Sequence, residues 1–268
     1  DNSSCAGCDG VPNSGLVADA CGVCDGDNST CTDCLGIVNG NAVLDQCGVC
    51  NGDGSSCFVI STCFELATDG DNDVEEIQAG NIYSDQALLD LAYDPSDGGW
   101  RGDQYIGMRF GGVDIPQGTI ISEAYVQFTS GNNVNVNPSS MVVFAEDIDD
   151  APQIGWDQYE LSGRTRTSAQ VAWAPAAWNT IGESGVDQQT PDIKSVIQEV
   201  VDRSGWVANN DILVMVSGTG TRCASTSNGA PNEAAQLCIS YSTAVVADCE
   251  GVLGGSALPG TACNDGDP

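Results

Sequence analysis

The stretch from Tyr105 to Phe128 alternates apolar or small residues with polar ones on both sides of "DIPQG". An alternation with a period of two is typical of a β-strand that is buried on one face. Pro116 and Gly118 suit a tight bend between the two runs, so the pattern predicts a β-hairpin. We expect this hairpin to form the centre of a β-sandwich.

The second strand of this hairpin shows its buried face most clearly. Ile121, Ala124, Val126 and Phe128 mark an inward face, and the residues between them are mostly polar. The spacing slips by one residue near Glu123, and such a slip indicates a β-bulge.

Short apolar runs recur between residues 58 and 245 at about ten-residue spacing, a texture that is typical of an all-β sandwich. Gly, Asn or Pro separates the runs. The stretch holds enough aliphatic residues for a buried core. The predicted strands are 74–82, 88–92, 105–110, 120–129, 141–147, 170–173, 212–217 and 236–241.

One segment follows a helical period instead. In "TPDIKSVIQEVVDRSGW" we expect Thr190 as the N-cap, Pro191 at the first helical position and Gly205 at the C-terminal stop. This helix is predicted to close one end of the sandwich. Its apolar stripe consists of Ile193, Val196, Ile197, Val200 and Val201.

Residues 1–57 have a different composition, with eight Asp, no Lys or Arg and few apolar residues. When this stretch is shifted by 26 residues against itself, "DACGVCDGDNSTC" superposes on "DQCGVCNGDGSSC". It is therefore a tandem repeat, with one partial copy followed by two full copies. Residues 246–268 look like the start of a further Cys/Gly/Asp-rich module. Both ends thus fall in mid-unit, and we expect the chain to begin after any export signal.

The fourteen cysteines favour an oxidising compartment in which disulfides replace a hydrophobic core. CxxC pairs such as Cys21/Cys24 leave tetrahedral zinc as an alternative, although the chain contains no His. Spacing alone does not give the connectivity. We expect Cys223 and Cys238 to join each other and to staple the loop between the last two strands. The cysteines predicted to form disulfides are Cys8, Cys21, Cys24, Cys31, Cys34, Cys47, Cys50, Cys57, Cys223 and Cys238.

Together these patterns predict a mainly β protein, a jelly-roll-like β-sandwich with one short helix. Disulfide-rich 26-residue repeats with little regular secondary structure precede the sandwich. The predicted boundaries are 1–57 for the repeats, 58–245 for the sandwich and 246–268 for the start of the next module.

The formal net charge of −31 repels nucleic acid and anionic membrane surfaces. No apolar run approaches the roughly 20 residues that are needed to span a bilayer. We therefore expect an extracellular or cell-surface protein that neither binds nucleic acid nor inserts into a membrane.

The chain has no His, which excludes Ser-His-Asp and Cys-His catalysis and histidine-based metal sites. Oxidised cysteines supply no thiolate nucleophile. No carboxylate pair stands out among the 38 acidic residues as the acid and base of a hydrolase. No glycine loop suits a phosphate either, so we expect a protein that is not an enzyme.

Arginines are few in this acidic chain and therefore informative. Arg109, Arg164, Arg166 and Arg222 are expected to pair with Asp or Glu and so to pin loops, with ligand binding as the alternative. The five tryptophans are expected to fill the core or its ends, with a platform for stacking sugars as the alternative.

Calcium is the cofactor that the acidic turns suggest. "DGDN", "NGDG" and "DGDND" place carboxylates and amides on tight turns, and Ca²⁺ prefers such oxygen ligands. Turns also favour these residues without any metal, and that alternative stays open. The candidate ligands are Asp25, Asp27, Asp53, Asp69, Asp71 and Asp73.

Two N-x-[S/T] sequons begin at Asn2 and Asn28, at the same position in successive repeats. An exposed turn that is held by disulfides suits N-glycosylation. The neighbouring Ser and Thr residues offer O-linked sugar as the alternative.

Five segments in order, "YIGMRF...DIPQGTIISEAYVQF", "SGRTRTSAQVAW", "TPDIKSVIQEVVDRSGW", "MVSGTGTR" and "CISY", resemble a β-sandwich module of secreted bacterial and algal proteins. That module is similar to the carbohydrate-binding-module-like DNRLRE or disaggregatase-related group, over about residues 65 to 242. "DACGVCDGDNSTC" resembles cysteine-rich repeats of adhesive surface proteins and of thrombospondin-motif metalloproteases, and residues 251–268 resemble a module of Bacteroidetes surface proteins. The resemblance implies spacers, stalks and adhesive beads.

We therefore expect a non-enzymatic structural or adhesive module of an extracellular surface fibre or stalk. It is expected to be glycosylated and to associate with itself end to end into a filament. The alternative is a carbohydrate-binding module of a secreted multidomain protein, which would bind glycans.

Overall fold

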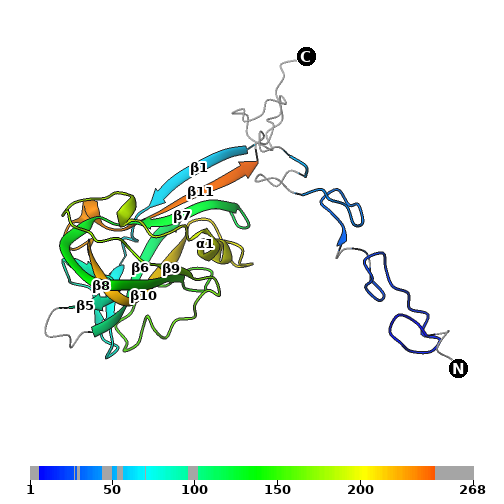
Figure 1. Cartoon of the computed structure of the whole chain (residues 1–268), viewed down its shortest axis with the longest axis horizontal. Coiled ribbons are helices and arrows are strands. Elements are labelled where there is room, and N and C mark those ends of the chain that lie inside the picture. Colours follow the sequence, from blue (N-terminus) through cyan, green and yellow to red (C-terminus); the bar gives the residue numbers. More distant parts are fainter. Residues whose placement is uncertain are drawn as a thin grey trace, which may run out of the picture. The chain divides into compact units, whose positions relative to one another are not determined.

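The structure, a computed structural model, describes residues 6–26, 28, 31–43, 50–52, 57–69, 71–95 and 102–244. The chain divides into two compact units, which we call the repeat unit and the sandwich unit. The repeat unit comprises Asp1–Phe58 with Thr243–Pro268, and the sandwich unit comprises Val59–Ser242. The protein is mainly β, and its regular secondary structure lies almost entirely in the sandwich unit (Figure 1).

Two sheets enclose the core of the sandwich unit. The smaller sheet has the order β1 (Cys57–Phe64), β11 (Gln236–Ala244) and β7 (Ile120–Gln127). The larger sheet is antiparallel, and β4 (Leu88–Asp90) and β5 (Tyr93–Asp94) pair with two of its strands. Its order is β3 (Ile82–Tyr83), β2 (Asp73–Ile77), β6 (Gly102–Val113), β10 (Asn210–Ser225), β8 (Ser130–Ala145) and β9 (Val171–Trp173).

The predicted hairpin between 105 and 128 is wrong, because its two strands lie in different sheets. β6 pairs with β2, β5 and β10, whereas β7 pairs with β11. The "DIPQG" segment therefore connects the sheets instead of joining neighbouring strands. The reason is that both strands bury their apolar faces in the same core from opposite sides, as Met108 of β6 and Val126 of β7 do. Hydrophobic periodicity predicts which face of a strand is buried, but it does not predict which strand pairs with it.

Other predictions about this stretch are confirmed. The inward residues Ile121, Ala124, Val126 and Phe128 are all buried. The bulge also occurs, because Ser240 pairs with Glu123 and Tyr241 pairs with Ile121, which leaves Ser122 as the extra residue.

The main core lies between the two sheets. Phe128 stacks on Trp173 with a ring separation of 5.8 Å and contacts Trp178 at 5.9 Å. A second apolar cluster includes Val74, Leu161 and Met215. It lies on the outer face of the larger sheet, because Met215 belongs to it while its neighbours along β10 point into the main core. Residues 146–166 cover this outer face.

The helix α1 (Lys194–Val201) lies against β7 and buries the predicted apolar stripe. It begins later than predicted, since its N-cap residue is Ile193 and not Thr190. Thr190 is buried, and its Oγ1 accepts a hydrogen bond from the Val126 N–H at 3.0 Å. Residues 190–193 thus follow the edge of β7 before the helix starts. Two 3₁₀ turns, Val186–Gln188 and Pro231–Glu233, complete the unit.

Candidate functional site

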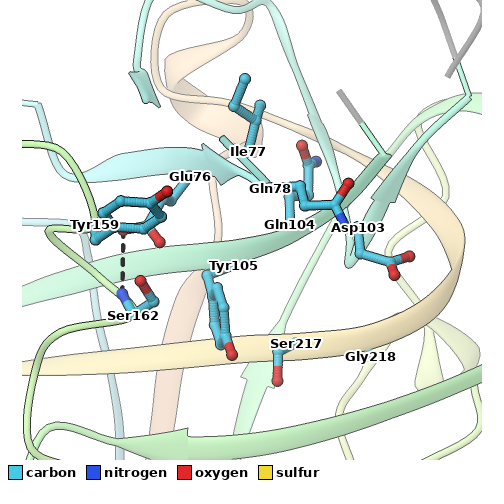
Figure 2. Close-up of a pocket in the computed structure, with 10 residues that line it drawn as sticks. All are labelled: Glu76, Ile77, Gln78, Asp103, Gln104, Tyr105, Tyr159, Ser162, Ser217 and Gly218. Carbon is cyan, nitrogen blue, oxygen red and sulfur yellow. Dashed lines mark hydrogen bonds between the residues drawn. The ribbon is translucent and has the colours of Figure 1, made fainter. Parts of the chain in front are cut away.

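A pocket of about 320 Å³ opens on the outer face of the larger sheet (Figure 2). Tyr105 comes from β6, Ser217 from β10 and Glu76 from β2, while Tyr159 and Ser162 come from the covering loop. The remaining lining residues are Ile77, Gln78, Asp103, Gln104 and Gly218. The pocket therefore combines two aromatic rings with carboxylate, amide and hydroxyl groups.

The loop that forms the rim is fixed to the sheet at several points. Oε2 of the buried Glu76 accepts the Leu161 N–H at 2.6 Å and the Ser162 N–H at 3.1 Å. Leu161 itself packs against Gly107, where an added Cβ would come within 2.7 Å of its side chain. The Tyr159 N–H donates to the Gly80 oxygen at 2.8 Å. Because these contacts need no ligand, the rim is preformed.

Tyr159 has an unusual backbone conformation among the residues of the rim. Its φ angle of 66° lies in the left-handed region, which is costly for a bulky side chain. Its side chain rests on the turn at Gly80, where an added Cβ would come within 2.6 Å of the ring. Even so, the residue is 52% exposed, so core packing does not account for this arrangement. Strain of this kind concentrates at binding sites.

Tyr105 forms the second aromatic wall and is supported from another element. The Arg166 guanidinium lies 4.8 Å from the Tyr105 ring centre and 4.6 Å from that of Phe144. Such cation–π contacts hold the tyrosine ring in place. Arg166 was expected to pair with a carboxylate, and the structure instead shows it against these rings.

Arg109 and Arg164 pair with carboxylates as predicted and pin loops. Arg109 contacts Asp69 at 2.7 Å and also pairs with Asp211. This contact holds the pKa of Asp69 at about 2. Arg164 contacts Glu146 and Glu160, each at 2.6 Å.

Arg222 differs from the prediction, because it bonds to backbone oxygens instead of a loop carboxylate. It donates to the oxygens of Pro175 and Ala176 at 2.7 and 2.6 Å, and to Asn137 Oδ1 at 2.8 Å. The side chain is fully buried, and burial lowers the pKa of its guanidinium. Backbone carbonyl groups of the segment after β9 therefore satisfy the charge, and a sequence pattern does not reveal which carbonyl groups lie within reach.

Three of the four described tryptophans fill the core, as predicted, and the fourth is exposed. Trp173, Trp178 and Trp206 are buried, whereas Trp156 is 65% exposed. Trp100 lies outside the described residues. A platform of several tryptophans therefore does not form among the described residues, and the tyrosines of the pocket supply the exposed aromatic groups.

The predicted staple between Cys223 and Cys238 is wrong. Cys238 instead joins Cys63 across β1 and β11, with 3.9 Å between the Cα atoms. Cys223 is a buried free thiol beside Asp90, and burial, with Asp90 nearby, raises its pKa. The two cysteines lie on strands of different sheets, which places their side chains out of reach. Sequence proximity along the loop suggested the wrong partner.

Disulfides hold the repeat unit, as predicted, and alternate in a fixed pattern. Cys8–Cys24 and Cys34–Cys50 each span 16 residues, and Cys21–Cys31 spans 10 residues. Cys47 and the side chain of Cys57 lie outside the described residues. Because the six cysteines Cys8, Cys21, Cys24, Cys31, Cys34 and Cys50 are paired with one another, they do not form zinc sites.

A shorter period lies within each 26-residue repeat. Isolated bridges begin at Ala6, Ala18 and Thr32, so similar turns recur after 12 and then 14 residues. Gly10, Gly22 and Gly36 have left-handed φ angles, and so have Asn13, Asp25 and Asn39 three residues later. We call each such turn a half-repeat. The pattern D-x-x-G-[V/I]-x-[D/N]-G in the second and third turns was the signal for it.

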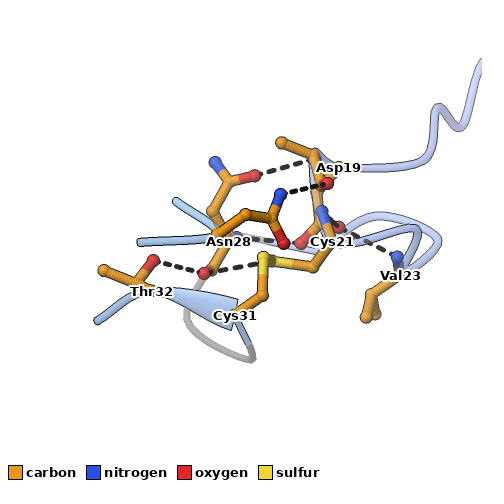
Figure 3. The surroundings of a disulfide bond; sticks show 8 residues. Asp19, Cys21, Val23, Asn28, Cys31 and Thr32 are labelled. Carbon is orange, nitrogen blue, oxygen red and sulfur yellow. Dashed lines mark hydrogen bonds between the residues drawn. A yellow bond between two sulfur atoms is a disulfide. The ribbon is translucent and has the colours of Figure 1, made fainter. Parts of the chain in front are cut away.

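Aspartates organise these turns by accepting backbone hydrogen bonds (Figure 3). Asp19 accepts the N–H groups of Cys21 and Val23 at 2.9 Å and that of Asn28 at 2.8 Å. Asp33 does the same for three backbone N–H groups fourteen residues later. These bonds, first that from Ile37, lower the pKa of Asp33. Sequence reasoning missed both residues and singled out Asp25 instead.

The candidate calcium ligands do not come together in the described residues. Asp69 is engaged by Arg109 and Gln153, and Asp73 accepts the N–H of Ser227 at 2.6 Å and its hydroxyl at 2.5 Å. No cluster of three metal-ligating side chains occurs in the part of the chain that the structure describes. Asp27 and Asp53 lie outside those residues. Asp25 and Asp71 lie within them, and neither belongs to such a cluster.

Of the two sequon residues, Asn28 is described and Asn2 is not. Asn28 is half-buried, and its Oδ1 accepts the Ala20 N–H at 2.8 Å. No helix in the described ranges combines the length and the apolar character that crossing a bilayer requires.

Comparison with known proteins adds no assignment to this geometry. No protein-family model matches the chain, and no curated protein matches it significantly.

Proposed function

We propose that this protein is a non-enzymatic structural or adhesive module of an extracellular surface fibre or stalk. The observation that carries the proposal is the regular series of half-repeats, each closed by disulfides and by hydrogen bonds to the backbone. Such a segment keeps a defined form without a hydrophobic core, and this suits a spacer that works outside the cell. The exposed Val11, Val23 and Ile37 occupy matching half-repeat positions, which supports the absence of a core there.

The arginines of the sandwich unit support the same proposal, because their contacts are structural. Arg109 and Arg164 pair with carboxylates, and Arg222 donates hydrogen bonds to backbone oxygens. These residues therefore pin loops. We propose that the module carries glycans on its repeats and associates end to end, which would generate a filament when the contact is not closed.

Sedimentation velocity of the oxidised 268-residue chain tests this assembly. We expect an open-ended series of oligomers that grows with protein concentration, because a head-to-tail contact has no natural limit. A single species at every concentration would contradict the end-to-end part of the proposal.

A second candidate function is carbohydrate binding at the Tyr105–Tyr159 pocket. The specific observation that favours it is the preformed rim, with the strained and half-exposed Tyr159 opposite polar groups that can bind sugar hydroxyls. Glu76 and Asp103 would repel acidic sugars, so the proposed ligand is neutral.

A glycan array with the wild-type chain and two variants tests this site. Tyr159→Ala should abolish the retention of neutral glycans, whereas Trp156→Ala should retain it, because Trp156 is exposed on the same loop but does not line the pocket. Sugar binding is ruled out at this pocket when Tyr159→Ala binds as the wild-type chain does, or when the wild-type chain retains no glycan.

A further inference from the structure

The two edges of the smaller sheet differ in what covers them. The outer edge of β7 is occupied by the protein's own chain. The Thr190 N–H donates to the Val126 oxygen at 3.1 Å, and the Ile193 N–H donates to the Ala124 oxygen at 2.7 Å. At the opposite edge, β1 pairs with β11 alone among the described strands.

The pairing shows which backbone groups of β1 face outward. Ala124 and Val126 direct their backbone groups at residues 190–193, so Tyr125 between them directs its own at β11 and forms a hydrogen-bonded pair with Cys238. Cys238 therefore turns its backbone groups away from β1. The Cys63–Cys238 pair is then a non-hydrogen-bonded pair, in agreement with its short Cα separation of 3.9 Å.

It follows that Cys63 points its N–H and C=O groups toward the outer edge. Successive residues of a strand alternate, so Ser61 and Val59 do the same. The Ser61 hydroxyl lies 2.8 Å from that of Ser240, which confirms that these two residues lie opposite each other. The outer edge of β1 thus presents the backbone groups of Val59, Ser61 and Cys63.

This edge also lacks two of the features that normally prevent edge pairing, which are charged residues and proline. Natural edge strands carry charges, proline or bulges that discourage another strand. The sequence of β1, "CFVISTCF", contains neither charge nor proline, and Glu123 is the one charged residue in all three strand sequences of this sheet. Val59 is 58% exposed and Ile60 is 39% exposed.

We propose that β1 pairs with β1 of a second copy of this chain, in an antiparallel two-fold contact centred on Ser61. Ser61 then faces the same residue of the second copy, and Val59 faces Cys63. Two copies with a net charge of −31 repel each other over most surfaces, and an uncharged edge is where they approach at least cost. A basic partner would be drawn to the acidic surfaces instead.

This contact goes beyond the proposed end-to-end association. A two-fold contact is closed, so it joins two copies side by side and does not propagate. The smaller sheets of the two copies would form one continuous sheet through backbone hydrogen bonds.

Ser61→Pro tests the contact directly in the oxidised 268-residue chain. Proline removes the outward N–H of residue 61, which β11 does not use. Two-fold symmetry doubles the loss, so dimer affinity should fall about tenfold or more. Ser61→Ala is the matched control, because it removes the same hydroxyl contact and keeps the N–H. Sedimentation equilibrium measures the affinity, and near-UV circular dichroism checks the fold.

Val59→Glu keeps the test valid if Ser61→Pro does not fold. It places like charges at the contact, and Val207→Glu, at a residue that is 61% exposed outside the sheets, adds the same charge elsewhere. We expect Val59→Glu to weaken the dimer much more than Val207→Glu does. Added salt should strengthen the wild-type dimer by screening repulsion.

The proposal is overturned if the wild-type chain forms no dimer, or if Ser61→Pro and Val59→Glu dimerise as their controls do. Weakening by salt would also overturn it, because that result indicates attraction between opposite charges. Longer oligomers that persist in Ser61→Pro would support end-to-end association separately.

Discussion

The repeat unit and the sandwich unit use opposite means to hold a backbone in place. In the sandwich unit, residues such as Phe128 and Trp178 are completely buried between two sheets. In the described part of the repeat unit, by contrast, Val17 is 75% exposed and Val43 is 70% exposed. Disulfides and aspartate side chains replace the core there. One chain therefore joins a domain that is ordered by its packed core to a segment that is ordered by disulfides and side-chain hydrogen bonds.

Reduction should separate the two units most strongly. Each disulfide of the repeat unit closes a short loop and is expected to contribute about 3 kcal/mol. Under a mild reductant without denaturant, we expect rapid proteolysis within residues 6–52, while the sandwich unit stays resistant. Mass spectrometry of the fragments and of alkylated cysteines reads out both effects.

Cys223 serves as the internal control for that experiment. Burial raises the pKa of its thiol, so it should not react with iodoacetamide until the sandwich unit unfolds. Equal loss of structure in both units on reduction would contradict the contrast between them.

Truncation of the core should give the next largest effect, confined to the sandwich unit. Phe128→Ala removes a buried ring that contacts Trp173 and Trp178, and should lower the free energy of unfolding by about 3–5 kcal/mol. Ile120→Ala, at a residue of β7 that is 43% exposed, should cost far less. Urea denaturation followed by tryptophan fluorescence measures both values.

Disulfide mapping completes this prediction. The pairs Cys8–Cys24 and Cys21–Cys31 should form in Phe128→Ala as they do in the wild-type chain. Mispairing of these cysteines would show that the repeat unit depends on the sandwich core, which would contradict the independence of the two units.

Substitution of a turn aspartate should have a smaller, local effect. Asp19→Ala leaves the N–H groups of Cys21, Val23 and Asn28 without their acceptor, at a cost of about 1–2 kcal/mol locally. Hydrogen exchange should accelerate over residues 20–28. Asp25→Ala also removes a carboxylate from this turn, and exchange at residues 21 and 23 should change less in that variant.

The smallest effect is expected at the Arg109–Asp69 pair of the sandwich unit, because the Asp69 side chain is 57% exposed and solvent screens the pair. Arg109 holds the pKa of Asp69 at about 2, below its ordinary value of 3.8. Stability from this pair is therefore complete above about pH 4 and is lost as the pH falls toward 2. Asp69→Asn should remove part of the acid dependence of the thermal midpoint in that window. An unchanged dependence would show that the pair adds nothing measurable.

The sequence predicted which residues of a segment are buried better than it predicted which distant segments pair with each other. Alternation identified the buried face of β7 and the helix stripe, because both depend on residues that are close in sequence. It did not predict that β6 and β7 lie in different sheets, nor that Cys63 reaches Cys238 across 175 residues. Those contacts depend on how the whole chain folds.

The candidate pocket was harder still to predict. Tyr105 stood in a recognised strand, but Tyr159 lies in an irregular loop whose position depends on Glu76, far away in the sequence. The left-handed conformation of Tyr159 leaves no mark on the sequence, since glycine or asparagine would be expected there. Arg222 shows the same limit, because backbone oxygens are invisible to a pattern of side chains.

Electron microscopy of the protein isolated from its source under non-reducing conditions tests the central claim most directly. If the protein is a structural module of a fibre or stalk, the images should show globular beads joined end to end through thinner connecting segments. Isolated monomers throughout, with no end-to-end association at any concentration, would contradict the account.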